Sequence, residues 1–278
     1  MSEFEKLKVV TRYELLKQFR RKRFYGGLAI TVLAVVLTIG LYLGLDLPRR
    51  IGISENIINQ QGAEIFAIFV TSMGALAILG AVFFAGDAIA SEFEQKTGYI
   101  LFPNPVKRNT IVIGKYLACF IATATILTIA YLISACALLV FYRQIPVGIL
   151  GSLAIALMLA CFVISLAFAF SSVLKGGMGA TIATLLTYMV LFSVISSSLA
   201  YAGYNPWFMP DRAGDAMTAT YGVPLQEVFH GGMMGGGQVG TGMVQASQNP
   251  TLSFFVLLVY AVVFFGISIW MTKRKEMT

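Results

Sequence analysis

Six stretches of the chain are long and apolar enough to cross a bilayer, and none contains Asp, Glu, Lys, Arg or His. They cover residues 27–45, 65–86, 116–141, 147–174, 177–201 and 252–271. A helix needs about 20 apolar residues to cross the hydrocarbon core with its backbone hydrogen bonds satisfied internally. The sequence therefore predicts an all-α, polytopic membrane protein with six transmembrane helices. Charged residues make up only 12% of the chain, far below the proportion in soluble domains.

The positive charges predict how the chain is oriented in the membrane. Of the 20 Lys and Arg residues, eight precede the first span, four lie between spans two and three or at their edge, one lies between spans four and five, and three follow the last span. The remaining four are Arg49, Arg50, Arg143 and Arg212. The positive-inside rule then places both termini in the cytoplasm, with the protein in the cytoplasmic membrane. Because the bases are spread along one side of the bilayer, their excess does not indicate nucleic acid as a partner.

The predicted domain organisation is simple. Residues 1–25 form a basic N-terminal helix, with apolar positions at Phe4, Leu7, Val10, Leu15 and Phe19. Such a helix is expected to lie in the cytoplasmic headgroup layer, held by anionic lipid, although a solvated basic tail that only sets topology is the alternative. Residues 26–278 form the six-span domain, with a cytoplasmic segment at 87–115 and an extracytoplasmic loop at 202–251. The link at 46–64 is expected to be short and polar, and the stretch YGVPLQEVF at 221–229 could form a short amphipathic helix within the last loop.

The segment at 87–115 is the only long cytoplasmic link between spans. Its charged and helix-breaking residues include Asp87, Glu92, Glu94, Pro103, Pro105, Lys107, Arg108 and Lys115. We expect the acids to continue the second span as helical turns, and the two prolines to break that helix because they cannot donate backbone hydrogen bonds. A new helix is expected to follow the bases at 107 and 108 and to meet the membrane interface at residue 115.

This pattern of two acids, a Thr, a Pro-Val-x-Arg run and a Gly-Lys pair resembles the ABC-2 family of ATP-binding-cassette transporter permeases. The matching residues are Glu92, Glu94, Thr97, Pro105, Val106, Arg108, Gly114 and Lys115. Lys96 stands where the family usually has Gly, and Gly98 replaces a typical apolar residue. The six spans, the basic N-terminal segment and the long last loop fit the same family.

The resemblance implies that the segment is a coupling helix, which docks on a separate ATPase subunit. The residues expected to contact that ATPase are Glu92, Glu94, Thr97, Leu101, Pro105, Arg108 and Lys115. It also implies a second copy of the permease, or a paralogue, as a partner. A loop that only sets topology is the alternative, but topology requires Lys and Arg and neither the acids nor the paired prolines.

The chain itself is not expected to be an enzyme. A P-loop needs GxxxxGK followed by Ser or Thr, yet the closest run, NTIVIGKY, has Asn109 at the first glycine position and Tyr116 at the hydroxyl position. The single histidine, His230, excludes an HExxH metalloprotease. We therefore expect no catalytic residue and no cofactor in this chain, with ATP and Mg²⁺ bound by the partner ATPase. The uncharged spans also argue against an ion-coupled carrier.

Two other groups of residues allow more than one interpretation. Thr181, Thr184 and Tyr188 share a face of the fifth span and could line a substrate pathway, or could bond their own backbone and pack. The glycine-rich stretch HGGMMGGGQVGTGM offers thioethers to Cu(I), but nothing fixes a metal geometry, so a flexible loop with no metal is expected.

The predicted function is therefore a permease subunit of an ATP-binding-cassette transporter, with export implied by the resemblance. The alternative is a scaffold or mechanotransmitting membrane subunit of an assembly machine, such as one for copper-enzyme maturation, with an extracytoplasmic partner. The Met-rich loop is the feature that supports this alternative.

Overall fold

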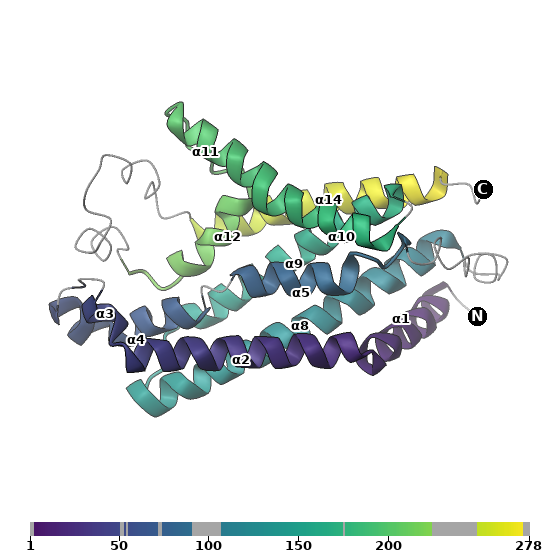
Figure 1. Ribbon diagram of the computed structural model, residues 1–278. Helices are drawn as coiled ribbons and strands as arrows, with labels where there is room; N and C mark the ends of the chain where they lie inside the picture. Colours follow the sequence, from purple (N-terminus) through teal and green to yellow (C-terminus); the bar gives the residue numbers. More distant parts are fainter. Residues whose placement is uncertain are drawn as a thin grey trace.

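The computed structural model describes residues 3–50, 53, 55–71, 74–90, 107–174, 176–223 and 249–274. Within these ranges all regular secondary structure is helical (Figure 1). The elements are α1 (Glu3–Arg20), α2 (Lys22–Gly44), α3 (Leu47–Arg50), α4 (Glu55–Thr71), α5 (Gly74–Ala85), α8 (Arg108–Tyr142), α9 (Gly148–Val173), α10 (Gly177–Leu186), the π-helix η1 (Thr187–Phe192), α11 (Ser193–Tyr201), α12 (Pro210–Ala219) and α14 (Pro250–Arg274).

The predicted all-α fold with six membrane-spanning helices is confirmed. The helices long and apolar enough to span are Lys22–Gly44, Glu55–Ala85, Asn109–Tyr142, Gly148–Val173, Gly177–Tyr201 and Pro250–Thr272. The second of these combines α4 and α5 and begins at Glu55 rather than at residue 65. Helix α4 therefore carries Glu64 one residue before the apolar stretch, where the sequence predicted a polar link.

Helix α9 is the central helix of the bundle, because it packs against α5, α8, α10, α12 and α14. Figure 1 shows it behind α5. Its Phe162 is fully buried and contacts four aromatic rings, those of Tyr188, Phe192, Tyr260 and Phe264. Lipid tails are as apolar as these side chains, so close packing and not expulsion from water holds the spans together.

The fifth span contains one turn of π-helix between α10 and α11. A π-helical turn inserts an extra residue and shifts the side chains that follow it. Tyr188 in this turn is buried against Phe162 of α9, and a Cβ added to Gly214 of α12 would lie 3.3 Å from its hydroxyl. The π-helical turn thus places Tyr188 of the fifth span between α9 and α12.

Helix α12 lies at the end of the bundle opposite the termini (Figure 1) and was not predicted within residues 202–251. Pro210 occupies its first turn, where a missing N–H costs nothing. The helix buries Ala213, Ala216 and Met217 against the spans. After it, the hydroxyl of the buried Tyr221 lies 2.8 Å from Thr71 Oγ1 of α4, and burial raises the pKa of Tyr221.

The short amphipathic helix predicted over residues 221–229 falls mostly outside the described residues. Residues 221–223 are described, and they are not helical.

Candidate functional site

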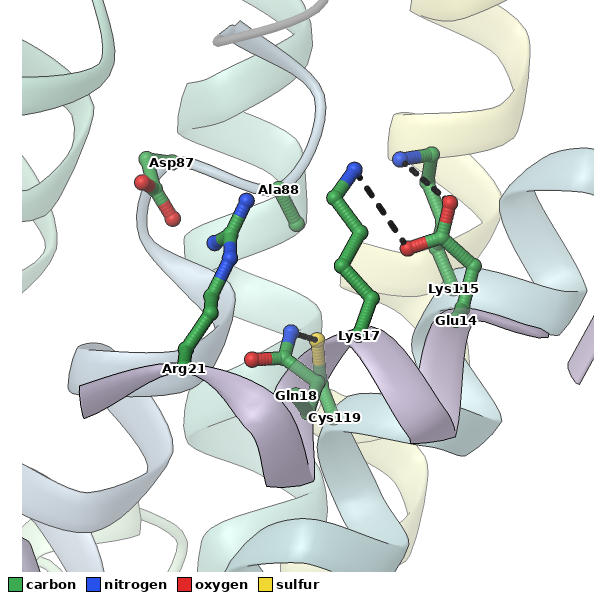
Figure 2. A pocket seen from close by; sticks show the side chains of 8 residues that line it. All are labelled: Glu14, Lys17, Gln18, Arg21, Asp87, Ala88, Lys115 and Cys119. Carbon is green, nitrogen blue, oxygen red and sulfur yellow. Dashed lines mark hydrogen bonds and ion pairs between the residues drawn. The ribbon is translucent and has the colours of Figure 1, made fainter. Parts of the chain in front are cut away.

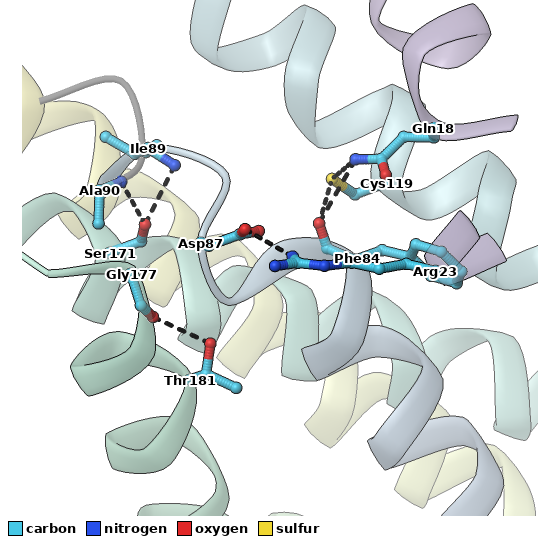
Figure 3. A network of polar contacts seen from close by, with 10 residues as sticks. All are labelled: Gln18, Arg23, Phe84, Asp87, Ile89, Ala90, Cys119, Ser171, Gly177 and Thr181. Carbon is cyan, nitrogen blue, oxygen red and sulfur yellow. Dashed lines mark hydrogen bonds and ion pairs between the residues drawn. The ribbon is translucent and has the colours of Figure 1, made fainter. Parts of the chain in front are cut away.

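The segment at 87–115 leaves the bundle through a turn and not through a helical extension of the second span. Helix α5 ends at Ala85, and residues 86–89 form the turn. The backbone N–H groups of Ile89 and Ala90 donate to Ser171 Oγ of α9 at 3.0 and 2.8 Å (Figure 3). The predicted helical continuation at Asp87 is therefore wrong, because a serine of another span satisfies the N–H groups that a continuing helix would use.

The turn approaches the fifth span closely at Gly86. A Cβ at this position would lie 2.8 Å from the carbonyl oxygen of Val82 and 3.0 Å from Cβ of Thr181 in α10. Only a glycine fits such a separation without movement of its neighbours.

The first charged residue of the segment is held at this turn. The carboxylate Oδ2 of Asp87 accepts a hydrogen bond from the guanidinium of Arg23 at 2.6 Å (Figure 3). Arg23 lies in the first turn of α2, so the ion pair joins the start of the first span to the end of the second.

The segment returns to the bundle at the start of α8, for which Lys107 is the N-cap. Further along α8, the side chain of Lys115 is almost fully buried, and its Nζ lies 3.1 Å from Glu14 Oε1 of α1 (Figure 2). Lys107 Nζ is 3.6 Å from Glu3 Oε1 at the beginning of α1. Two acids of α1 therefore pair with two bases of this returning helix.

Helix α1 packs directly on α8. It ends at Arg20 instead of continuing to residue 25 as predicted, because Arg21 takes an extended conformation before α2 begins. A Cβ added to Gly114 of α8 would lie 2.7 Å from Cγ1 of Val10, so the absence of a side chain lets the two helices meet. Part of the apolar stripe that was predicted to face lipid thus contacts protein.

Gln18 joins three helices at the centre of this region. Its Nε2 donates to the carbonyl oxygen of Phe84 in α5 and contacts Cys119 Sγ of α8, both at 3.5 Å (Figure 3). The thiol of Cys119 also donates to the Phe84 carbonyl, at 3.2 Å. This carbonyl belongs to the last turn of α5, where the intrahelical partners run out.

A small pocket lies among these contacts, and its composition is ionic (Figure 2). It is lined by Glu14, Lys17, Gln18, Arg21, Asp87, Ala88, Lys115 and Cys119. We call these residues, together with Arg23 and Phe84, the junction. Three bases and two acids line it, which suits a fastening between helices better than a cavity for an apolar cargo.

The structure places only some of the predicted site residues. Glu92, Glu94, Thr97, Leu101 and Pro105 lie outside the described residues. Arg108 is the first residue of α8, and Lys115 belongs to the junction. Sequence reasoning missed Glu14, Gln18, Arg23 and Cys119. The signal that could have indicated two of them is spacing, because Glu14 and Gln18 follow Val10 at intervals of four residues and so share its face of α1.

The three hydroxyl residues of the fifth span bond locally or pack. The hydroxyls of Thr181 and Thr184 donate to the carbonyls of Gly177 and Ala180, four residues earlier. Thr184 is fully buried, and Tyr188 packs on Phe162. These contacts agree with the packing interpretation, and a pathway role stays a prediction.

Residues 9–277 match the family model described as ABC-2 family transporter protein. The chain belongs to the ABC-2 transporter family. No curated protein matches the chain. This match covers nearly the whole chain and confirms the resemblance inferred from residues 92–115. Together with the six apolar helices, it makes this ABC-2 protein a multi-pass membrane subunit of a transporter.

The described residues do not form a metal site. Within the described ranges, no group of three or more His, Cys, Asp or Glu side chains could hold a metal ion. His230, Met233, Met234 and Met243 of the Met-rich loop lie outside those ranges.

Proposed function

We propose that this ABC-2 protein is the permease subunit of an exporter and is moved by a separate ATPase that docks on residues 87–115. The observation that best supports this proposal is that both ends of the segment are fastened to the bundle. One end is held by Asp87 to Arg23, and the other by Lys115 to Glu14. A force applied to the segment therefore reaches α5, which is the second half of span two, and α8, which forms the whole of span three.

The junction supports a simple mechanism. ATP-driven closure of the ATPase dimer moves the docked segment, which tilts spans two and three against the packed α9. This tilt biases an inward-facing state toward an outward-facing one, because packed helices change between discrete arrangements. A second copy or a paralogue completes the pathway, with Thr181, Thr184 and Tyr188 as its candidate lining. Export is the direction that the family resemblance favours.

The orientation makes a first testable prediction. Figure 1 shows both termini at one end of the bundle and α12 at the other. A membrane-impermeant thiol reagent should label a cysteine placed at Gln238 in intact cells. A cysteine at Asn109 should react only after permeabilisation. Labelling at residue 109 in intact cells would show that the proposed orientation is reversed.

The energy source makes a second prediction. The purified chain should hydrolyse ATP no faster than a buffer control, because its 278 residues contain no P-loop. Addition of the partner ATPase should produce hydrolysis in a complex that co-purifies with the permease. Turnover by the permease alone, or failure to co-purify with any ATPase of the same operon, would contradict the proposal.

A further inference from the structure

We propose that α1 fastens the two ends of segment 87–115 to each other, with Glu14 and Gln18 as positioning residues, so that spans two and three move as one body. This inference rests on the proposed function. It adds a role for α1 in converting ATP hydrolysis into movement, distinct from docking of the ATPase.

Helix α1 connects the helices at the two ends of the segment. The segment leaves from α5 and returns in α8, and α1 bonds to both helices. Gln18 reaches the Phe84 carbonyl of α5, and four residues earlier on the same face of α1, Glu14 reaches Lys115 of α8. Arg23, which follows α1, adds the contact to Asp87.

The ion pairs at the ends of the segment differ in burial. The side chains of Lys115 and Glu14 are 6% and 17% exposed, whereas Arg23 is 53% exposed in its pair with Asp87. Water screens an exposed pair, but a buried charge that loses a partner stays desolvated. Glu14 also lies 3.9 Å from the more exposed Lys17, so Glu14–Lys115 is the most deeply buried of the ion pairs described at the junction.

Glu14 and Gln18 lie apart from the docking residues. Six of the seven residues expected to contact the ATPase lie between positions 92 and 108, and the seventh, Lys115, is buried against Glu14 and has little surface to offer a partner. Loss of the fastening should leave the ATPase bound and hydrolysing ATP, while its movement no longer reaches both spans. The expected defect is uncoupling and not loss of assembly.

The first experiment measures the fastening without any ATPase. Hydrogen exchange is followed in the full chain in lipid nanodiscs for Glu14→Lys, Lys115→Glu and the exchanged pair carrying both changes. Each single reversal should speed exchange at residues 86–90 and 107–115 on the order of tenfold, because both ends of the segment open more often. The exchanged pair should recover most of the protection.

A matched control distinguishes the effect of losing the ion pair from the effect of a change in net charge. Arg12→Glu makes the same reversal as Lys115→Glu at an exposed position of α1 and should leave exchange unchanged. If Glu14→Lys leaves residues 86–90 as protected as in the wild type, or if the exchanged pair recovers nothing, the inference is wrong.

The second experiment measures coupling in the complex with the partner ATPase. Spin labels at the exposed positions Gln60 and Ala202 report movement at the far end of the bundle, in a chain with Cys136 and Cys161 replaced by Ser. On addition of ATP and vanadate, the wild-type distance should change. The complex that carries Glu14→Lys should hydrolyse ATP at a rate within about twofold of the wild type, but the distance should no longer change. Without the fastening, the ATPase no longer favours the outward-facing over the inward-facing arrangement of the spans. The exchanged pair should regain the distance change.

The outcomes distinguish this inference from the proposed function. A distance change in Glu14→Lys equal to that of the wild type overturns the role of α1. If the wild-type chain binds no ATPase, the proposed function fails, and the exchange experiment alone decides whether α1 fastens the segment.

Discussion

Reversal of two charges in the docking segment, Glu92→Lys together with Arg108→Glu, is expected to abolish transport and association with the ATPase while membrane insertion stays intact. Both residues lie outside the apolar stretches, and the double change conserves net charge. At a docking surface each reversal replaces attraction by repulsion across a partly desolvated interface. The penalty is on the order of several kcal/mol, enough to dissociate a complex of modest affinity.

Co-purification of a tagged permease with its ATPase measures this effect. The control is Arg49→Glu with Glu55→Lys, which makes the same pair of reversals in an exposed ion pair at the opposite end of the bundle. The control should retain the ATPase fully. An undiminished yield of complex from the docking variant, together with normal transport, would mean that residues 87–115 only set topology.

The substitution Gly148→Ala is expected to displace α12 and the residues that follow it. A Cβ at position 148 would lie 2.5 Å from the carbonyl oxygen of Thr220 and 2.9 Å from its carbonyl carbon. These are backbone atoms, so no side-chain rotation relieves the clash. Overpacking of this kind costs roughly 1–3 kcal/mol. The largest change should appear at α12, which depends on its packing against the spans.

Thermal unfolding of the detergent-solubilised protein and thiol labelling of a Met217→Cys variant measure this prediction. Gly148→Ala should lower the Tm and expose residue 217 to the reagent. Gly151→Ala is the matched control, since its Cβ would meet only side-chain atoms of Thr220, the methyl at 3.2 Å and Cβ at 3.5 Å, and the methyl can move. Gly266→Ala has nothing within 4 Å and should be neutral. Equal Tm values for the first two variants would show that the contact at Thr220 is not tight.

The sequence alone predicted the six spans and the family correctly. Each span is a local property, because any segment that crosses the hydrocarbon must supply its own apolar surface and its own hydrogen bonds. The family followed from residues 92–115, whose acids, prolines and bases lie close together in the chain. Neither conclusion required knowledge of which helices are neighbours.

The junction depended on the tertiary structure. Glu14 and Lys115, or Gln18 and Phe84, are far apart in sequence, and no spacing rule relates them. Asp87 could have continued a helix, until Ser171 of another span accepted the hydrogen bonds of Ile89 and Ala90. The acceptor of such a hydrogen bond is the polar group that the fold places nearest to the N–H.

Helix α12, at the opposite end of the bundle, also could not be predicted from the sequence. A helix of 10 residues is marginal by itself, because nucleation is costly and few hydrogen bonds repay it. Its sequence, PDRAGDAMTA, is too polar to indicate a buried element. It is held by the packing of Ala213, Ala216 and Met217 on the bundle and by the hydrogen bond that Ser196 Oγ of α11 donates to Asp211 Oδ1 at 2.6 Å. The sequence thus determined which segments cross the membrane, since the bilayer imposes that requirement on each segment separately. The tertiary structure decided how α1, α12 and the ends of segment 87–115 are held, since their partners are brought together only by the fold.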